Sequence, residues 1–223
     1  MPRLELSAVL WDLDGTIIDS EPLWLAAEQA MLDRFGIPLT AETRDRLVGT
    51  GLWEAAEQFR QMGVEMSADD IVAEWVAGVA RGFDRLAPAW RPGAPELLHS
   101  LRDAGIPCAL VTMSVRSLAE QVVRELPTGV FSAIVAGDEV AHAKPHPDPY
   151  LRAAAALGVP IEQCLAIEDS PTGLRSASAS GAIAIGVPNL VPLDEAPAHA
   201  LWPSLAGVEA GRVRAAFASL RGD

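Results

Sequence analysis

The stretch VLWDLDGTIIDS, residues 9–20, places an apolar run directly before two aspartates, Asp12 and Asp14, that are separated by one residue. A short apolar run without alternation is typical of a strand covered on both faces, as in a parallel sheet. Gly15 follows the second aspartate and gives the backbone freedom to turn. The stretch therefore predicts a buried strand that delivers two carboxylates at the point where the chain leaves the core.

Length and charge limit the class of protein. The chain has 223 residues, 50% of them hydrophobic, and a formal net charge of −13 at pH 7. This length favours one large domain, or a main domain with a smaller insert. The scattered arginines argue against nucleic-acid binding, and the apolar runs are far shorter than the roughly 20 residues of a membrane span. We expect a cytoplasmic monomer that binds a small molecule, with no nucleic-acid and no membrane partner.

Two residue types are rare enough to be informative. The two cysteines, Cys108 and Cys164, lie inside apolar segments, where buried and reduced thiols are expected. Lys144 is the single lysine among 17 basic residues. It therefore does not belong to a general population of surface lysines.

Short apolar runs recur along the chain, with helical patterns between most of them. The runs predict strands at residues 8–11, 109–111, 133–135, 164–167 and 183–187, and the patterns predict helices at 95–104, 115–126, 150–157 and 171–180. The tail predicts one more strand near Trp202 and a closing helix over 207–220. This alternation is typical of an α/β fold with a doubly wound, Rossmann-like parallel sheet.

The first two predicted strands are separated by about 95 residues, where a crossover normally needs only a few dozen. The segment between them contains helical patterns at 22–35, 41–47, 52–62 and 68–86. We therefore expect a small helical domain at residues 19–88, inserted into a core formed by residues 1–18 and 89–223.

Polar residues follow each of the first four predicted strands. Because ligands bind beyond the carboxyl ends of strands in doubly wound sheets, we expect these side chains to converge. They are Asp12, Asp14, Thr112, Ser114, Lys144, Glu168 and Asp169. Carboxylates crowded with one ammonium group need a counter-ion, and oxygen ligands without histidine or thiol favour Mg²⁺. The predicted metal ligands are Asp12, Asp14, Glu168 and Asp169, and the predicted phosphate-binding residues are Thr112, Met113, Ser114 and Lys144.

Each of these residues also has a purely structural interpretation. Asp12 or Asp14 alone could serve a turn, and Asp169 could cap the helix that starts near Pro171. Taken together at four strand ends, the residues favour a site. His142 and His146 flank Lys144, but without a partner ligand they are interpreted as surface or packing residues.

The residues that carry this chemistry resemble a known family. The segments DLDGT, LVTMS, AKPHPDPYL and IEDSPTG resemble, in order, the four motifs of the haloacid dehalogenase-like (HAD) phosphotransferase superfamily. The inserted helical segment resembles the cap of its first subfamily. The resemblance runs from about residue 9 to residue 187.

The resemblance implies roles for the site residues. Asp12 would be the nucleophile that forms an aspartyl-phosphate, and Asp14 would be the general acid and then the general base. Mg²⁺ would be held by the Asp12 carboxylate, the Asp14 main-chain carbonyl and Asp169, with Glu168 binding directly or through water. The resemblance therefore implies a Mg²⁺-dependent phosphatase that acts on a small phosphomonoester, with a sugar phosphate favoured.

Individual residues disfavour other branches of the superfamily. Dehalogenases lack the second aspartate, phosphonoacetaldehyde hydrolases use a cap lysine that is missing here, and β-phosphoglucomutase carries an arginine where this chain has Leu52. A sugar phosphomutase remains the alternative enzyme, and a phosphate-sensing module is the alternative from another class. The candidate specificity residues are Trp24, Gly49, Thr50 and Trp53, but the sequence does not name the substrate. Asp19 is expected to be a helix cap or a hinge.

Overall fold

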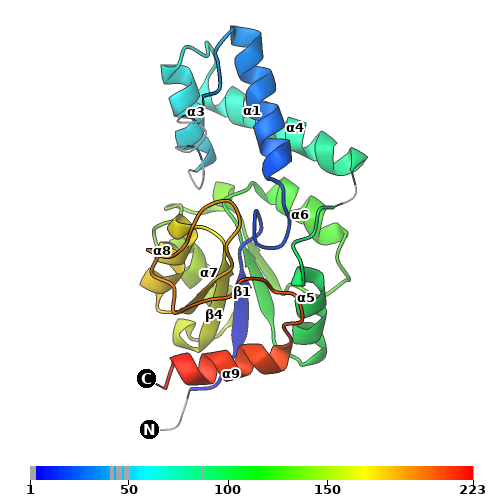
Figure 1. The fold of residues 1–223 in the computed structure, drawn as a ribbon, viewed down its shortest axis with the longest axis vertical. Helices are drawn as coiled ribbons and strands as arrows, with labels where there is room; N and C mark the ends of the chain where they lie inside the picture. The colour runs from blue at the N-terminus through cyan, green and yellow to red at the C-terminus, as the bar shows by residue number, and fades with distance from the viewer. Residues whose placement is uncertain (1–3, 41–42, 44–46, 48–50, 87, 223) are drawn as a thin grey trace.

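The computed structural model describes residues 4–40, 43, 47, 51–86 and 88–222. Its described part contains a six-stranded sheet in the order β3-β2-β1-β4-β5-β6, with every neighbouring pair parallel (Figure 1). The strands are β1 (Ala8–Trp11), β2 (Cys108–Val111), β3 (Ala133–Val135), β4 (Cys164–Glu168), β5 (Ile183–Gly186) and β6 (Ala200–Leu201). The order reverses between β1 and β4, so the crevice expected at such a switch point lies at their carboxyl ends.

Helices cover both faces of the sheet. They are α5 (Ala94–Asp103), α6 (Arg116–Arg124), α7 (Asp148–Leu157), α8 (Pro171–Ser180) and α9 (Ala210–Leu220). Val9 and Trp11 of β1 pack on one face with α5 and α9, whereas Ala8 and Leu10 pack on the other with α7 and α8. Alternate residues of one strand therefore serve two separate hydrophobic clusters, as the period of two requires.

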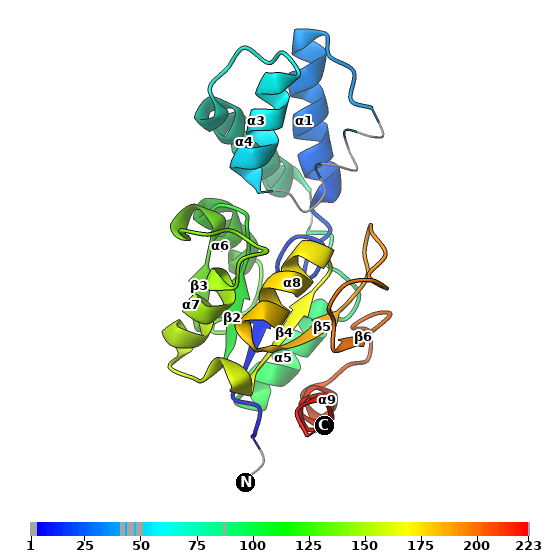
Figure 2. The ribbon, with the colours of Figure 1, turned by 90° about the vertical axis from the view of Figure 1, so that its left-hand side faces the viewer.

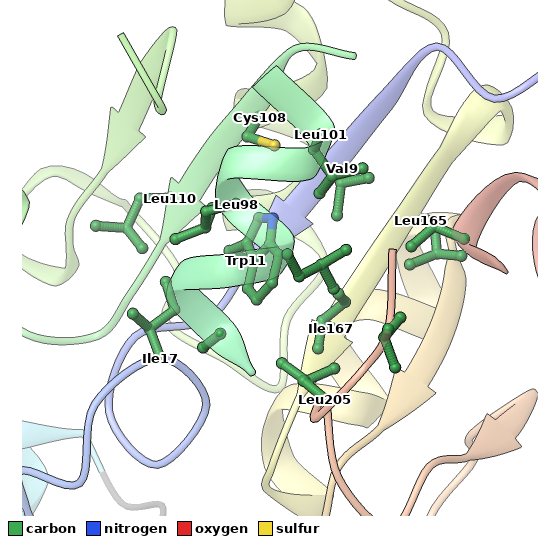
Figure 3. Packing of buried hydrophobic residues seen from close by; sticks show 14 of the residues in the cluster. Val9, Trp11, Ile17, Leu98, Leu101, Cys108, Leu110, Leu165, Ile167 and Leu205 are labelled. Atoms are coloured by element: carbon green, nitrogen blue, oxygen red, sulfur yellow. The ribbon is translucent and has the colours of Figure 1, made fainter. Parts of the chain in front are cut away.

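Trp11 lies deep in the first of these clusters. It is fully buried and is surrounded by side chains from β1, β2, β4 and α5 (Figure 3). Each large apolar side chain buried in this way contributes about 1.5–3 kcal/mol to folding. The residue that precedes Asp12 is thus one of the most firmly packed in the chain.

The elements predicted for the sheet and its helices are confirmed, with changes at their ends. Strand β4 extends to Glu168, and β5 ends at Gly186. The closing helix begins at Ala210 and not at residue 207, because Gly207 has a left-handed φ of 72° and ends a turn before the helix. At α7, Pro147 occupies the N-cap position and Asp148 is the first helical residue.

Among the described residues, the first helices that follow β1 are α1 (Glu21–Phe35), α3 (Leu52–Gln61) and α4 (Ala68–Arg85), and we call them the helical insertion. They share a hydrophobic cluster in which the rings of Phe59 and Trp75 meet edge to face, with centroids 4.7 Å apart. The insertion lies beyond the carboxyl ends of the strands (Figures 1 and 2). The helix expected at 41–47 falls largely outside the described residues.

Side chains of α6 connect the insertion to the rest of the chain. Leu118 belongs to the same hydrophobic cluster as α4, and Gln121 Nε2 donates to Asp84 Oδ1 at 2.8 Å and to the Ala80 carbonyl at 3.2 Å. Helices α4 and α6 therefore pack the insertion against the core.

We propose the division expected from the sequence, with residues 1–18 and 89–223 as the core and residues 19–88 as the insertion. Two observations support this division. The chain leaves the core near residue 18 and returns near residue 89, and these two points lie side by side. Ile18 forms an antiparallel bridge with Trp90, and the Asp19 amide donates to the Ala89 carbonyl at 2.8 Å. Ser20 and not Asp19 occupies the N-cap position of α1, so the helix-cap alternative for Asp19 is wrong.

None of the helices in the described part of the chain combines the length and the apolar character that a membrane crossing demands.

Cys108 and Cys164 are both free and buried. Burial raises the pKa of each thiol to about 12, so both stay protonated at neutral pH. Because the thiolate is the reactive form, we expect neither thiol to react with Ellman's reagent at pH 8 in the native protein. After unfolding in guanidinium, two thiols per chain should react. Rapid release of the chromophore from the native protein would contradict this prediction.

Candidate active site

A cleft lies between the carboxyl ends of the strands and the helical insertion. Its core side is lined by residues that follow β1, β2, β4 and β5, and its other side by residues of α1 and α3. Asp12, Asp14, Met113, Ser114, Lys144 and Asp169 all line this cleft. Of the seven side chains expected to converge, Thr112 and Glu168 do not line the cleft; both are fully buried and contact Asp14 and Lys144 respectively.

Asp12 is fixed at the end of β1 by its backbone and by its side chain. Its amide donates to the Ile167 carbonyl of β4 at 3.1 Å, which continues the sheet pairing beyond Trp11. One carboxylate oxygen, Oδ1, accepts a hydrogen bond from Lys144 Nζ at 2.8 Å. Asp12 is nevertheless 7% exposed, so it reaches the cleft from a firmly held position.

Lys144 contacts three oxygens at once. Its ammonium donates to Asp12 Oδ1, to Glu168 Oε1 at 2.6 Å and to the Val111 carbonyl at 2.9 Å. Burial alone would lower the pKa of Lys144, but the negative charges of Asp12 and Glu168 outweigh it and raise that pKa above its usual value. The only lysine of the chain is therefore a permanent positive charge inside the acidic cluster.

The acidic groups remain undercompensated even with Lys144 present. Burial and the charge of Glu168 raise the pKa of Asp12 to about 7, although Lys144 opposes the shift. Burial and the charges of Asp12 and Glu168 raise the pKa of Asp169 well above its usual value. A further positive charge at this point would stabilise the ionised carboxylates.

The donors at this position fit a small divalent cation. Carboxylate oxygens of Asp12, Glu168 and Asp169 lie within 4.8 Å of one another, and oxygen ligands suit Mg²⁺. Glu168 differs from the other two, because it is fully buried and both of its oxygens are engaged. Oε1 accepts from Lys144 and from Tyr150, and Oε2 accepts from the Asp169 amide at 3.2 Å.

Asp14 points toward a different set of donors. Its Oδ1 accepts from Ser20 Oγ at 2.5 Å and from Trp24 Nε1 at 3.3 Å, and its Oδ2 accepts from Ser114 Oγ at 2.7 Å and from Thr112 Oγ1 at 3.3 Å. Ser20 and Trp24 lie at the start of the helical insertion. The two aspartates of the opening motif therefore have separate environments, one at Lys144 and one between the core and the insertion.

Gly15 allows this arrangement. It has a φ of 88°, and a Cβ at this position would lie 1.9 Å from Asp169 Oδ2. A side chain would thus both strain the turn and occupy the place of a candidate metal ligand.

The turn that follows β2 is stabilised by a hydrogen bond between its own residues. Thr112 is fully buried, and its Oγ1 accepts a hydrogen bond from the Ser114 amide at 3.0 Å. Met113 and Ser114 line the cleft, and Thr112 orders the turn that carries them. These contacts place three of the expected phosphate-binding residues in one tight turn.

The candidate specificity residues have different positions. Trp24 lines the cleft, whereas Trp53 is 41% exposed and donates to Asp69 Oδ1 at 2.8 Å on the surface of the insertion. Leu52 and Ala55 line the cleft, because they are three residues apart and share a face of α3 that Trp53 does not. Gly49 and Thr50 lie outside the described residues.

Sequence reasoning missed Asn189, which also lines the cleft. It follows β5, so the rule that was applied to the first four strand ends would have identified it at the fifth. Tyr150 was missed for another reason: it was assigned only to the helix, and nothing in the pattern shows that its hydroxyl reaches Glu168 at 2.6 Å.

Gly173 offers a test of how tightly Glu168 is enclosed. A Cβ at Gly173 would lie 2.0 Å from Glu168 Cδ, so Gly173→Ala should lower the free energy of unfolding by about 1–3 kcal/mol and reduce the melting temperature. Gly211→Ala is the matched control, because a Cβ there would meet no atom of the described residues within 4 Å beyond its chain neighbours and the backbone of α9 itself, and its melting temperature should not fall. Equal melting temperatures in calorimetry would contradict the close contact.

Comparison with known proteins identifies the family. The family model of haloacid dehalogenase-like hydrolases matches residues 6–181. Phosphoglycolate phosphatase from Neisseria meningitidis is 33% identical over 82% of this chain and 80% of its own length, and validoxylamine A 7'-phosphate phosphatase from Streptomyces hygroscopicus subsp. limoneus is 32% identical over 80% and 84%.

A solved structure agrees with these relatives. CbbY from Rhodobacter sphaeroides, crystallised as a mutant with xylulose-(1,5)bisphosphate, superposes with a TM-score of 0.83 at 30% identity, covering 91% of this chain and 96% of that one. The family model, which matches residues 6–181, includes the residues from Asp12 to Asp169 that line the core side of the cleft. The chain therefore belongs to the haloacid dehalogenase-like hydrolase family.

Proposed function

We propose that this protein is a Mg²⁺-dependent phosphatase that hydrolyses a small phosphomonoester through an aspartyl-phosphate on Asp12. The observation that carries the proposal is the convergence of Asp12, Asp14, Lys144 and Asp169 in one cleft under a helical insertion. Relatives named for phosphoglycolate and for validoxylamine A 7'-phosphate support a small phosphate ester as the substrate.

In the first step, an oxygen of Asp12 attacks phosphorus while the bond from phosphorus to the substrate oxygen breaks. Lys144 holds Oδ1 at 2.8 Å and so orients the attacking carboxylate. Asp14 gives its proton to the leaving oxygen and becomes a carboxylate. The product of this step is the free alcohol and a phosphorylated Asp12.

In the second step, Asp14 takes a proton from a water molecule that attacks phosphorus. The bond between phosphorus and Asp12 breaks, and inorganic phosphate leaves. Four donors hold Asp14, and two of them, Ser20 and Trp24, belong to the start of the insertion. These contacts fix the position of the Asp14 carboxyl group at the boundary between core and cap, apart from the nucleophile Asp12.

The Asp12 and Asp169 carboxylates and the Asp14 main-chain carbonyl would hold Mg²⁺, with Glu168 beside them. When bound, the cation keeps the carboxylates ionised and offsets the repulsion between Asp12 and the phosphate. Thr112, Met113, Ser114 and Lys144 would contribute donors to the phosphate oxygens, through side chains and through the backbone of their turn.

The helical insertion would act as the cap that selects the substrate. Trp24 lines the cleft and supports a role in specificity, and Gly49 and Thr50 remain candidates. Leu52 lines the cleft with an apolar side chain, and the resemblance to β-phosphoglucomutase implies an arginine at this position, so we favour the phosphatase over the phosphomutase. We favour a sugar phosphate as the substrate and propose that the enzyme works as a cytoplasmic monomer.

Replacement of the nucleophile provides the first test. Asp12→Asn should lower kcat for p-nitrophenyl phosphate with Mg²⁺ by at least about 1,000-fold, because the amide cannot form the acyl-phosphate. EDTA should abolish wild-type activity and excess Mg²⁺ should restore it. Asp103→Asn is the control, since this exposed carboxylate pairs with Arg102 on α5. Activity that survives Asp12→Asn would contradict the mechanism.

Product analysis provides the second test. Across a panel of sugar phosphates, phosphoglycolate and nucleotides, we expect release of inorganic phosphate without formation of an isomeric sugar phosphate. Phosphate would be measured colorimetrically and the sugar products by ³¹P NMR. An isomer that forms only after addition of a sugar bisphosphate would instead establish a phosphomutase.

A further inference from the structure

The chain has one tyrosine, Tyr150, and the proposed mechanism gives it no role. It lies in the first turns of α7, its side chain is fully buried, and its hydroxyl donates to Glu168 Oε1 at 2.6 Å. We propose that Tyr150 is a positioning residue that keeps Lys144 oriented on Asp12 by sharing the charge of Glu168. The inference rests on the proposed phosphatase function.

Lys144 lies between two carboxylates that compete for it. Its ammonium is 2.8 Å from Asp12 Oδ1 and 2.6 Å from Glu168 Oε1. A buried carboxylate with fewer donors attracts a cation more strongly, because no water screens its charge. Any donor that satisfies Glu168 therefore reduces its pull on Lys144 and favours the contact with Asp12.

Tyr150 supplies that donor to the same oxygen that Lys144 contacts. The other oxygen of Glu168 is held by the Asp169 amide at 3.2 Å and by Ser170 Oγ at 3.4 Å. Gly173 packs against the carboxyl group from behind. Removal of the Tyr150 hydroxyl would leave Lys144 as the donor to Oε1 among the contacts of the described residues, and the lysine would move toward Glu168.

A phenol is neutral at physiological pH because its ordinary pKa is about 10, so the hydroxyl of Tyr150 is available to donate to Glu168. The ring makes a separate contact, since Lys144 Nζ lies 5.2 Å from the ring centroid. Tyr150→Phe keeps the ring and removes only the hydroxyl.

A matched control removes a different hydrogen bond to the segment between Lys144 and Tyr150. Ser176 Oγ on α8 donates to the His146 carbonyl at 2.6 Å and so ties down the chain between Lys144 and Tyr150. Ser176→Ala removes one buried hydroxyl and one hydrogen bond without touching Glu168. The kcat of Ser176→Ala therefore shows how activity responds when this segment loses a hydrogen bond that does not involve Glu168.

The first measurement is kinetic, with p-nitrophenyl phosphate and saturating Mg²⁺ at a temperature well below the melting point of each variant. Because loss of a partner behind an active-site group typically costs 10–100-fold, Tyr150→Phe should lower kcat roughly tenfold and change KM less than about twofold. Ser176→Ala should keep a kcat within about twofold of the wild type. An unchanged kcat in Tyr150→Phe, or an equal loss in Ser176→Ala, would overturn the positioning role.

The second measurement does not depend on turnover. Because Tyr150 is the only tyrosine, full-length protein labelled with 3-fluorotyrosine gives a single ¹⁹F NMR resonance. Glu168→Gln replaces the charged acceptor and should shift this resonance, whereas Ser176→Ala should leave it in place. If the wild-type protein is active and Glu168→Gln does not shift the resonance, this inference alone would be overturned. A wild-type protein that releases no phosphate from any ester of the panel would overturn the proposed function.

Discussion

One buried ammonium group connects the parts of this site. Lys144 donates to the carboxylate at the end of β1, to a carboxylate of β4 and to the last carbonyl of β2. Three neighbouring strands therefore meet at one positive charge, and without it two buried carboxylates would face each other uncompensated. The surrounding structure serves this contact, because prolines on both sides of His146 restrain the segment that carries Lys144.

Asp12 has a fixed position because alternate side chains of the preceding strand, β1, pack into two different hydrophobic clusters. Trp11 packs against α5 on one face and Leu10 packs against α7 and α8 on the other, so β1 is packed on both faces. Glycines then admit the polar groups where there is no room for a Cβ. Gly15 leaves space for Asp169 and Gly173 leaves space for Glu168, so two turns far apart in sequence close around the same cluster.

Most of the fold and much of the site could be predicted from the sequence, because strand ends are defined by local patterns. Apolar runs located the first five strands of the sheet, and the polar residues that follow these runs include Asp12, Lys144 and Asp169, which line the cleft. Side-chain direction on the helical insertion could not be predicted, since it depends on how α3 packs, and Trp53 lies on the surface while Leu52 faces the cleft. The hydrogen bond from the Tyr150 hydroxyl to Glu168 could not be predicted either. The two residues are 18 positions apart in sequence, and only the packing of α7 on the sheet brings them together.

The indole of Trp24 has a consequence for how this enzyme can change. Its Nε1 contacts Asp14 Oδ1 at 3.3 Å while the same residue lines the wall of the cleft. Under the proposed function, recognition of the substrate and positioning of Asp14 as the proton donor would thus depend on one side chain. Acquisition of a new substrate by substitution at this position would alter the acid as well, whereas Leu52 and Ala55 on α3 can vary without touching it. Under the proposed function, we therefore expect specificity to diverge through α3 rather than through the first turn of α1.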